Sequence, residues 1–470
     1  MDMNRRLALA GVGATGSILA LSSIPAANAI TVSTQGKTAR VCDPEFGADP
    51  TGVKDSTAAF LAAIKAVAPV NDGKTVGVVS VDAGLYRITP GKIDIPGRVI
   101  IRGVPKVTKY IANNVPAGGY SEPTALFSIG SWGTPSGGTG GDKWRMRAGI
   151  ENAVIKTRDA EDWGIPTSDI PKNLVGILFN TYLGNPPQNP DSYHHLTNIE
   201  VWDVDFGIMI LGQDDQGIKV NNVRIDRTLS AGLIVGRPLW HPASIAANKP
   251  AGGGADNQFI DVDVHGCNLG DGGFAGIEVY TSNCVFTACK SWYIRRATVS
   301  DVLNRPTTGT WDEKVAAFRP GAGFFVYGRS NTFIGCASQE TGGNGWVIVG
   351  KSTALASCRA ESASFYDLAG TVTGDKTSTG VSTAACFYLT QDAVNSTYTG
   401  CIAQNLYGKE TGAKWGFYIE KYSDKIHVTS ARSVDMSQSG GDLNNTTTYG
   451  RDVYVHVNNH IYTNHQTHTL

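Results

Sequence analysis

The amino-acid sequence predicts an all-β solenoid, a single-stranded parallel β-helix, and two observations carry that prediction. The first is an internal repeat between about residues 257 and 436, seen in GIEVYTSNCVFTAC (276–289), GFFVYGRSNTFIGC (323–336), GWVIVGKSTALASC (345–358) and, more loosely, FYLTQDAVNSTYTGC (387–401). The second is the apolar alternation inside each copy, whose period of two indicates strands rather than a helix. Because one copy cannot bury its own apolar residues, the copies must stack around a shared core.

Cysteines close the successive copies, and their spacings of 22, 47, 22 and 43 residues set the expected length of a coil at about 22. They are Cys267, Cys289, Cys336, Cys358 and Cys401. Stacked coils place equivalent residues about 4.8 Å apart, so we expect one inward ladder of five thiols. Three positions earlier, a second ladder would hold Val264, Phe286, Phe333, Leu355 and Tyr398. A free cysteine behaves as a small buried apolar residue, so we expect core thiols rather than disulfides.

Composition narrows the classes of partner. The chain has 470 residues, a formal net charge of −1 and only 17% charged residues, with 56 glycines. A near-neutral chain has no electrostatic attraction for nucleic acid or for an anionic membrane surface. A surface rich in Ser, Thr, Asn and Gln suits an extracellular β protein with a polyhydroxylated ligand.

The first 29 residues have the three-part layout of a secretory signal. Arg5 and Arg6 precede a run of small apolar residues, and Ala27-Asn28-Ala29 fits a cleavage site. The run is short and glycine-rich for a membrane span, so no stable membrane insertion is expected. The alternative is an attachment segment of a virion protein, which would place the chain on a tail fibre or spike.

The segment that follows predicts a helix and then short strands. In VCDPEFGADPTGVKDSTAAFLAAIKAV (41–67) a turn cluster leads into a helix with an apolar face, and VGVVSVDAGLYRI (76–88) and IDIPGRVIIRGV (93–104) read as strands. These residues resemble the opening of pectate-lyase-superfamily right-handed β-helix proteins, which include polygalacturonases and bacteriophage tailspike depolymerases. The resemblance implies right-handed coils, an N-terminal capping helix, a polysaccharide substrate and, if the chain is a tailspike, a homotrimer.

Three regions are therefore expected. Residues 1–29 form the signal or attachment segment, 30–436 the β-helix domain, and 437–470 a C-terminal cap or oligomer contact. Long insertions at 112–142, 183–195, 238–256 and 297–322 interrupt the repeat. Loops of this length are usually functional, and we expect them to wall a groove.

No compact catalytic motif fixes the reaction, so candidate residues come from the repeat. Hydrolysis of a glycan needs two carboxyl groups, whereas a lyase needs a base with a cation such as Arg, Lys or calcium beside the uronate; no other cofactor is expected. Asp271 and Glu340 each follow a ladder cysteine by four residues. If their coils lie two steps apart, roughly 10 Å would separate the backbones. The alternative is a pair of solvated turn acids.

Glu278 is a second candidate. It lies between the inward Ile277 and Val279 and therefore points outward. Its equivalents in later copies are apolar or aromatic: Phe325, Val347, Tyr388 and Tyr418. Such a stripe suits either a sugar-binding face or an oligomer interface.

Two further groups complete the candidates. Gln213-Asp214-Asp215 resembles the paired aspartates of polygalacturonases, but the accompanying NTD, GHG and RIK elements are absent, so a turn-capping role is the alternative. Asp261, Asp263 and His265 alternate outward on one strand and form a reserve site. The sequence thus predicts a polysaccharide depolymerase acting by hydrolysis or β-elimination. The alternative is a non-catalytic β-helix adhesin or carbohydrate-binding surface protein.

Overall fold

The computed structural model divides the chain into two units, Met1–Gln35 and Gly36–Leu470. It describes residues 36–68, 75–115, 123–129, 147–159, 166–181, 192–213, 215–238, 240–247, 249–270, 273–295, 321–365, 385–406, 413–420, 424–436, 441–443, 454–457, 460–463 and 466–469. All of these lie in the second unit. The expected signal segment and most of the expected groove-walling insertions fall outside the described residues.

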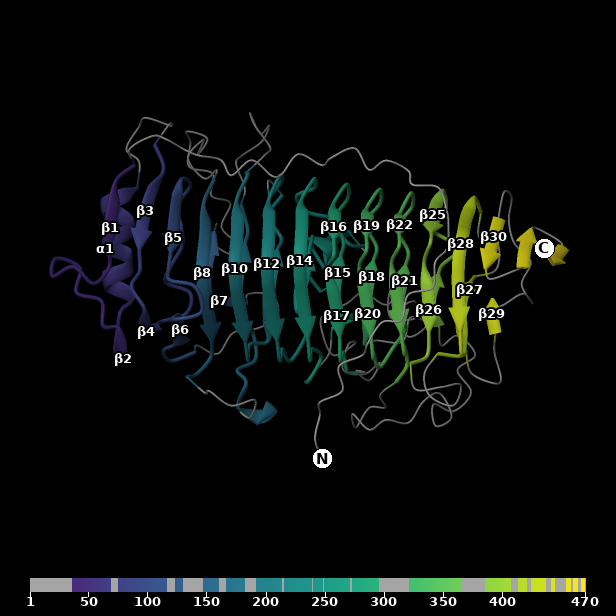
Figure 1. Ribbon diagram of the computed structural model, residues 1–470. Helices are drawn as coiled ribbons and strands as arrows, with labels where there is room; N and C mark the ends of the chain where they lie inside the picture. Colours follow the sequence, from purple (N-terminus) through teal and green to yellow (C-terminus); the bar gives the residue numbers. More distant parts are fainter. Residues whose placement is uncertain are drawn as a thin grey trace, which may run out of the picture. The chain divides into compact units, whose positions relative to one another are not determined.

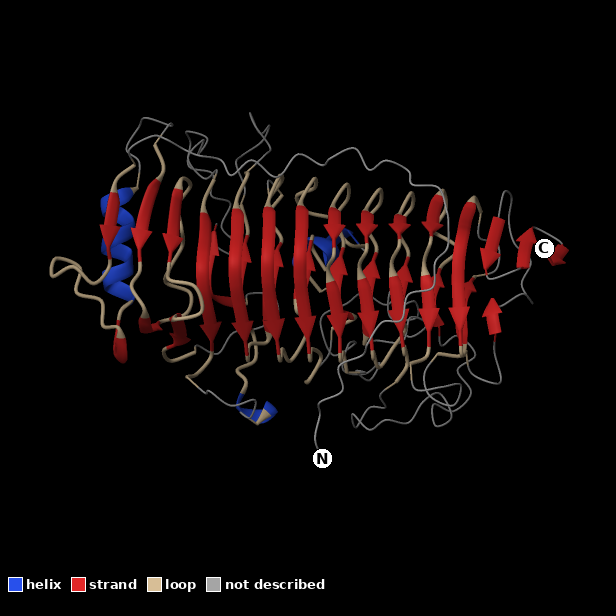
Figure 2. Cartoon of the chain, in the orientation of Figure 1, coloured by secondary structure: helices blue, strands red, loops and turns tan. Residues whose placement is uncertain are grey.

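The described strands form two sheets (Figures 1 and 2). The smaller sheet holds ten parallel strands: β7 (Thr124–Ile129), β9 (Leu174–Phe179), β11 (Phe206–Ile210), β13 (Leu233–Val235), β15 (Ala275–Val279), β18 (Ala322–Val326), β21 (Trp346–Ile348), β24 (Ala385–Leu389), β27 (Trp415–Ile419) and β29 (Gly441–Leu443).

The larger sheet holds 22 strands. They are β1 (Thr38–Arg40), β2 (Thr51–Asp55), β3 (Gly77–Ser80), β4 (Gly84–Ile88), β5 (Val99–Arg102), β6 (Thr108–Ala112), β8 (Gly149–Lys156), β10 (His195–Trp202), β12 (Lys219–Asp226), β14 (Gln258–His265), β16 (Val285–Thr287), β17 (Lys290–Trp292), β19 (Thr332–Ile334), β20 (Ala337–Gln339), β22 (Ala354–Ala356), β23 (Arg359–Glu361), β25 (Ser396–Thr399), β26 (Ile402–Gln404), β28 (Ile426–Val434), β30 (Tyr454–Val457), β31 (His460–Thr463) and β32 (Gln466–Thr469).

From β7 to β15 successive strands alternate between the two sheets, so each of these coils contributes to both. The chain runs from β10 to β11, then β12 to β13, then β14 to β15, and each strand pairs in parallel with its equivalent one coil on. In Figure 1 the strands β8, β10, β12 and β14 of the larger sheet lie side by side. The parallel β-helix expected from the repeat is therefore confirmed. Among the described strands only β30–β31 and β31–β32 pair antiparallel.

Stacked aromatic rings fill the interior. Phe259, Phe286 and Phe333 occupy equivalent positions with ring centroids 4.4 Å and 4.7 Å apart, and the ladder continues through Leu355 and Tyr398. Phe324 stacks on Trp346 at 3.9 Å. Such rings bury large apolar areas, which makes this ladder a main contributor to the core. The prediction that Val264 belongs to this ladder is wrong. Val264 pairs with Ser291, and Phe259 is the residue that pairs with Phe286.

The thiol ladder has four members instead of the expected five. All eight cysteines are free, which agrees with the expectation for the ladder cysteines, and Cys289, Cys336, Cys358 and Cys401 stand at equivalent positions. Opposite Cys289, however, stands Val262, because Ile260 pairs with Thr287 and Asp263 with Lys290. Cys267 lies five residues later, beyond the end of β14. The spacing of 22 between Cys267 and Cys289 is therefore not a coil length.

The smaller sheet is buried on both faces. Its inward residues, such as Ile277 and Phe324, join the interior core, while its outward residues form a second apolar cluster. The outward cluster includes Phe206, Phe325, Val347 and Tyr388, and the Trp240 ring lies 5.5 Å from Phe206. Burial on both faces explains the nearly continuous apolar runs in these strands.

The helix α1 (Thr57–Val67) lies beside the first strands and contacts β1 and β3. Phe60 is fully buried and makes edge contacts with the rings of Tyr86 and Tyr110, each at 5.7 Å. Through these contacts the apolar face of α1 covers the interior of the first coils. The other described α-helix, α2 (Pro242–Ala247), spans six residues.

Candidate functional site

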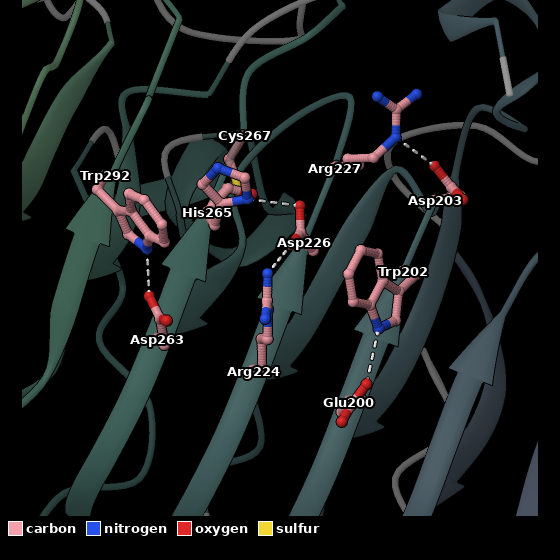
Figure 3. A network of polar contacts seen from close by, with 10 residues as sticks. All are labelled: Glu200, Trp202, Asp203, Arg224, Asp226, Arg227, Asp263, His265, Cys267 and Trp292. Atoms are coloured by element: carbon pink, nitrogen blue, oxygen red, sulfur yellow. Dashed lines mark hydrogen bonds and ion pairs between the residues drawn. The ribbon is translucent and has the colours of Figure 1, made fainter. Parts of the chain in front are cut away.

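The outer face of the larger sheet carries two rows of polar side chains on successive strands. One row holds Glu200 of β10, Arg224 of β12, Asp263 of β14 and Lys290 of β17. The second row, two residues further along each strand, holds Trp202, Asp226, His265 and Trp292. Residues at positions i and i+2 of a strand share a face, and neighbouring strands lie about 4.8 Å apart. The fold therefore brings acidic, basic and aromatic groups from four coils together (Figure 3).

Asp226 is the buried centre of this network. Its side chain is 0% exposed, and it accepts a hydrogen bond from His265 Nδ1 at 2.8 Å and one from Arg224 Nη2 at 2.9 Å. Because a carboxylate only accepts, Nδ1 of His265 must carry the proton. The buried Asp226 thus fixes the orientation of both neighbours, as Figure 3 shows.

Asp263 lies beside Asp226 on the next strand and accepts a hydrogen bond from the indole of Trp292. Burial raises the pKa of the Asp263 carboxyl, while Trp292 and the charge of Lys290 oppose the rise. Lys290 Nζ lies 4.1 Å from the centre of the Trp292 ring. A carboxyl group whose burial favours the protonated form is suited to donate a proton.

Glu200 stands on the other side of Arg224. Its Oε2 accepts a hydrogen bond from Trp202 Nε1 at 3.2 Å. Arg224 and Lys156 lie 5.0 Å and 5.4 Å from the centre of the Trp202 ring. These cation–π contacts hold the indole beside the carboxylate.

Asp203 and Arg227 form a separate ion pair near the ends of the same strands. Arg227 Nε lies 2.9 Å from Asp203 Oδ1, and the two side chains are 18% and 9% exposed, respectively. Burial raises the pKa of Asp203 although Arg227 lowers it. This pair links two coils and lies outside the lining of the cleft described next.

A cleft of about 490 Å³ runs over the outer face of β8, β10, β12 and β14. Its lining includes the acidic residues Glu200 and Asp263, with Arg224 between them, and on the same strands Asn198, Asn222 and Asp261, together with Pro105, Lys106, Ala153, Val154, Ile199 and Val223. Polar groups from three coils therefore face one elongated space.

Glu200 and Asp263 are two strands apart in the same row. Two strand spacings put their backbones roughly 10 Å apart. Inverting glycosidases hold their two carboxyl groups about 6.5–9.5 Å apart, which is close to this backbone spacing. The arrangement can supply a proton donor on one side of a bound sugar and a base on the other.

The first pair predicted from the sequence is Asp271 and Glu340. Their alignment assumed that Cys267 and Cys336 are equivalent, and the strand register shows that they are not. Asp271 lies outside the described residues. Glu340 is 1% exposed and lies beside Tyr293, whose pKa is raised to about 12 by burial and by this carboxylate.

Glu278 points away from the interior as predicted, and its register with Phe325, Val347, Tyr388 and Tyr418 is confirmed. The expected exposure is wrong, since Glu278 is 1% exposed within the second apolar cluster. Its carboxylate accepts hydrogen bonds from the Phe274 amide at 2.7 Å and the Tyr280 hydroxyl at 2.7 Å. The stripe is therefore core packing on the outer side of the smaller sheet.

Asp215 is fully buried and caps a turn. It accepts hydrogen bonds from the backbone amides of Gly212 at 2.7 Å and Thr181 at 3.2 Å. Asp214 lies outside the described residues. These contacts match the turn-capping alternative for the pair.

The reserve site of Asp261, Asp263 and His265 lies at the cleft. Sequence reasoning missed the residues beside it on the neighbouring strands. Asp261 and Asp263 line the cleft, and His265 belongs to the network. A signal for the missed residues was present: Asn198-x-Glu200-x-Trp202, Asn222-x-Arg224-x-Asp226 and Asp261-x-Asp263-x-His265 share one pattern. Aligning these three strands would have placed Glu200, Arg224 and Asp226 beside Asp263.

Within the described part of the chain, no group of three or more His, Cys, Asp or Glu side chains could hold a metal ion. The helices found there are also too short or too polar to cross a membrane.

Comparison with known proteins gives structural similarity without sequence similarity. No family model and no curated protein matches the chain. Full-length tailspike protein 2 of an Escherichia coli O157:H7 bacteriophage has a TM-score of 0.52 at 11% identity, covering 87% of this chain and 46% of the tailspike. The chain thus spans less than half the length of that tailspike.

Two enzymes are matched at lower scores. The A-module of a mannuronan C-5 epimerase of Azotobacter vinelandii has a TM-score of 0.47 at 12% identity, covering 89% of this chain and 99% of the module. The catalytic unit of an α-1,3-glucanase of Streptomyces thermodiastaticus has a TM-score of 0.45 at 14% identity, covering 90% and 70%. At such identities, similarity indicates a shared fold, and for the tailspike the score supports it.

Proposed function

We propose that this chain is a polysaccharide depolymerase that hydrolyses glycosidic bonds in the cleft over β8, β10, β12 and β14. The observation that carries the proposal is the pair Glu200 and Asp263, which lines one cleft from strands two steps apart. The matched tailspike comes from a phage, and the same protein is also matched as an enzymatically active domain, which agrees with an enzyme of this kind.

In the proposed reaction Asp263 is the general acid and Glu200 the general base. Asp263 donates its proton to the glycosidic oxygen as the bond to the anomeric carbon breaks. Glu200 removes a proton from a water molecule, whose oxygen then bonds to that carbon. The raised pKa of Asp263 keeps the proton available at a higher pH than for an ordinary aspartate.

The neighbouring groups position these two residues. Asp226 holds Arg224 between them, and Trp292 donates to the carboxylate of Asp263. Trp202 and Trp292 stand at the two ends of the second row, and partly exposed indole rings are groups on which sugars can stack. The same rings favour the second candidate function, a carbohydrate-binding protein without catalysis.

Product analysis separates these functions. Purified protein is incubated with a panel of capsular, exopolysaccharide and cell-wall glycans, and the products are weighed by mass spectrometry. Hydrolysis adds one water for each bond cleaved, whereas β-elimination adds none and leaves an ultraviolet-absorbing unsaturated sugar. If a glycan is bound but no product forms, only the carbohydrate-binding function is supported.

The remaining organisation belongs to the same proposal. The coils wind right-handed, α1 caps their N-terminal end, and the chain acts as a secreted protein or as a trimeric virion spike. N-terminal sequencing of native material tests secretion, since signal removal would leave Ile30 first. Light scattering tests the trimer, which would have three times the chain mass of 49.8 kDa.

A further inference from the structure

A row of asparagines runs along the edge of the cleft, one per coil. Asn152, Asn198 and Asn222 take equivalent positions in β8, β10 and β12, and Asp261 takes the next one in β14. All four have a left-handed backbone, with φ of 58°, 56°, 51° and 54°. Asn and Asp tolerate this conformation better than other residues with a side chain, which explains their choice here.

The side-chain amides of this row form a one-way chain of hydrogen bonds. Asn222 Nδ2 donates to Asn198 Oδ1 at 2.8 Å, and Asn198 Nδ2 donates to Asn152 Oδ1 at 2.8 Å. Asn152 Nδ2 then donates to the Gly103 carbonyl at 3.3 Å. The carbonyl fixes the direction of the whole chain, because turning the amides round would set the Asn152 oxygen against another acceptor.

The chain of amides ends in a conflict between acceptors. At the end of the row, the amide oxygen Oδ1 of Asn222 can only accept a hydrogen bond. The next residue along the row is Asp261. An ionised carboxylate only accepts hydrogen bonds, so it cannot continue the row. Within the described part of the structure no protein donor bridges the two residues, which lie on adjacent strands about 4.8 Å apart. Both are exposed and line the cleft.

We infer that Asn222 and Asp261 form a subsite for a sugar that presents hydrogen-bond donors, a hydroxyl or an amino group, and no carboxylate. The inference rests on the proposed function and names its substrate class. Of the charged groups that line the cleft, Glu200, Asp261 and Asp263 are acidic and Lys106 and Arg224 are basic, with Arg224 already paired with Asp226. A uronate carboxylate bound between Asn222 and Asp261 would face the Asp261 carboxylate and the amide oxygen of Asn222, and would be repelled.

The test measures binding in a full-length chain that carries Asp263→Asn, so that the glycan stays intact. Affinity electrophoresis uses gels containing dextran as the neutral glycan, glycol chitosan as the amino glycan, and polygalacturonate or alginate as the uronates. We expect retention by dextran or glycol chitosan, and the gel that retains the protein identifies which donor group is bound. Adding Asp261→Asn removes the charged acceptor and should weaken that retention by about tenfold or more.

Asp256→Asn is the matched control. Asp256 is also an exposed aspartate with positive φ, 60°, but it does not line the cleft. Its substitution should leave retention unchanged. A second readout needs no glycan: in Asp261→Asn the new Nδ2 donates to Asn222 Oδ1 and extends the row, so the melting temperature should rise. A fall would contradict the acceptor conflict.

The outcomes separate this inference from the proposed function. Retention by uronate gels alone, retention unaffected by Asp261→Asn, or no retention on any gel would overturn the subsite, even if the wild-type chain cleaves a glycan. Retention that depends on Asp261 without any cleavage by the wild-type chain would instead support the subsite and reject the depolymerase.

Discussion

Replacing Asp263 by Asn should abolish turnover while making the protein slightly more stable. Asn keeps the size of the side chain and can still accept the hydrogen bond from Trp292, but it cannot donate a proton to a leaving group. Removing a general acid lowers turnover by about 10²–10⁴-fold, which corresponds to about 3–5 kcal/mol of transition-state stabilisation.

The stability change follows from the direction of the pKa shift. Burial raises the folded-state pKa of Asp263 above its unfolded value, so the folded state loses stability relative to the unfolded state as pH rises through that pKa. The neutral Asn carries no such penalty. We expect a gain of about 0.5–1 kcal/mol at neutral pH, allowing for solvent screening, and a smaller gain at acidic pH.

Thermal unfolding at several pH values and steady-state turnover on the cleaved glycan measure the two effects. Asp203→Asn is the control, because Asp203 is also a buried carboxyl with a raised pKa but is paired with Arg227 outside the cleft. Because burial raises the pKa of Asp203 as well, its replacement should change stability in the same direction as Asp263→Asn, with turnover nearly unchanged. Turnover of Asp263→Asn within about tenfold of wild type would refute the assignment of the acid.

Three other predictions concern the scaffold. Burial would raise the pKa of Glu151, but hydrogen bonds from His195 and Arg102 lower it to about 2, so its contribution of about 1–2 kcal/mol is complete at neutral pH and is lost between about pH 4.5 and 2; Glu151→Gln should remove this dependence in acid unfolding curves. Phe333→Ala should cost about 3–5 kcal/mol in chemical denaturation, since it opens a cavity in the ring ladder, and a cost below about 1 kcal/mol would argue against the ladder. A thiol reagent should modify at most Cys42 in the native protein and all eight cysteines after denaturation, because the other seven are buried; rapid modification of several native thiols would contradict that burial.

Local pattern was enough to predict the repeat. The alternation in the copies around Phe286, Phe333 and Leu355 identified inward positions correctly, because each strand's pairing is repeated one coil on. The thiol prediction held for the same reason from Cys289 onward. It failed at Cys267, where one unbroken eight-residue strand, β14, precedes a coil whose strand is divided into β16 and β17.

The alternation of apolar residues could not predict that the outward side chains of the smaller sheet are covered by a second layer. Alternation shows that Glu278 points away from the core, but not that another layer covers it. The covering residues include Phe274 and Tyr280, and the second apolar cluster also contains Trp240 from a turn that interrupts the repeat. Trp240 is distant from Glu278 in the sequence, so the periodicity of the strand gives no sign of this outer layer.

The sequence by itself determined the solenoid, the inward residues and the free thiols, because these follow from a period of two within each strand and from residues repeated in successive coils. Only the tertiary structure decided the site. Glu200, Arg224 and Asp263 come from coils of unequal length, separated by 24 and 39 residues, so that no fixed spacing joins them. The hydrogen-bonded register, set by the pairing of whole strands, places these three side chains in one row and places Asp261 next to Asn222 in the row of asparagines.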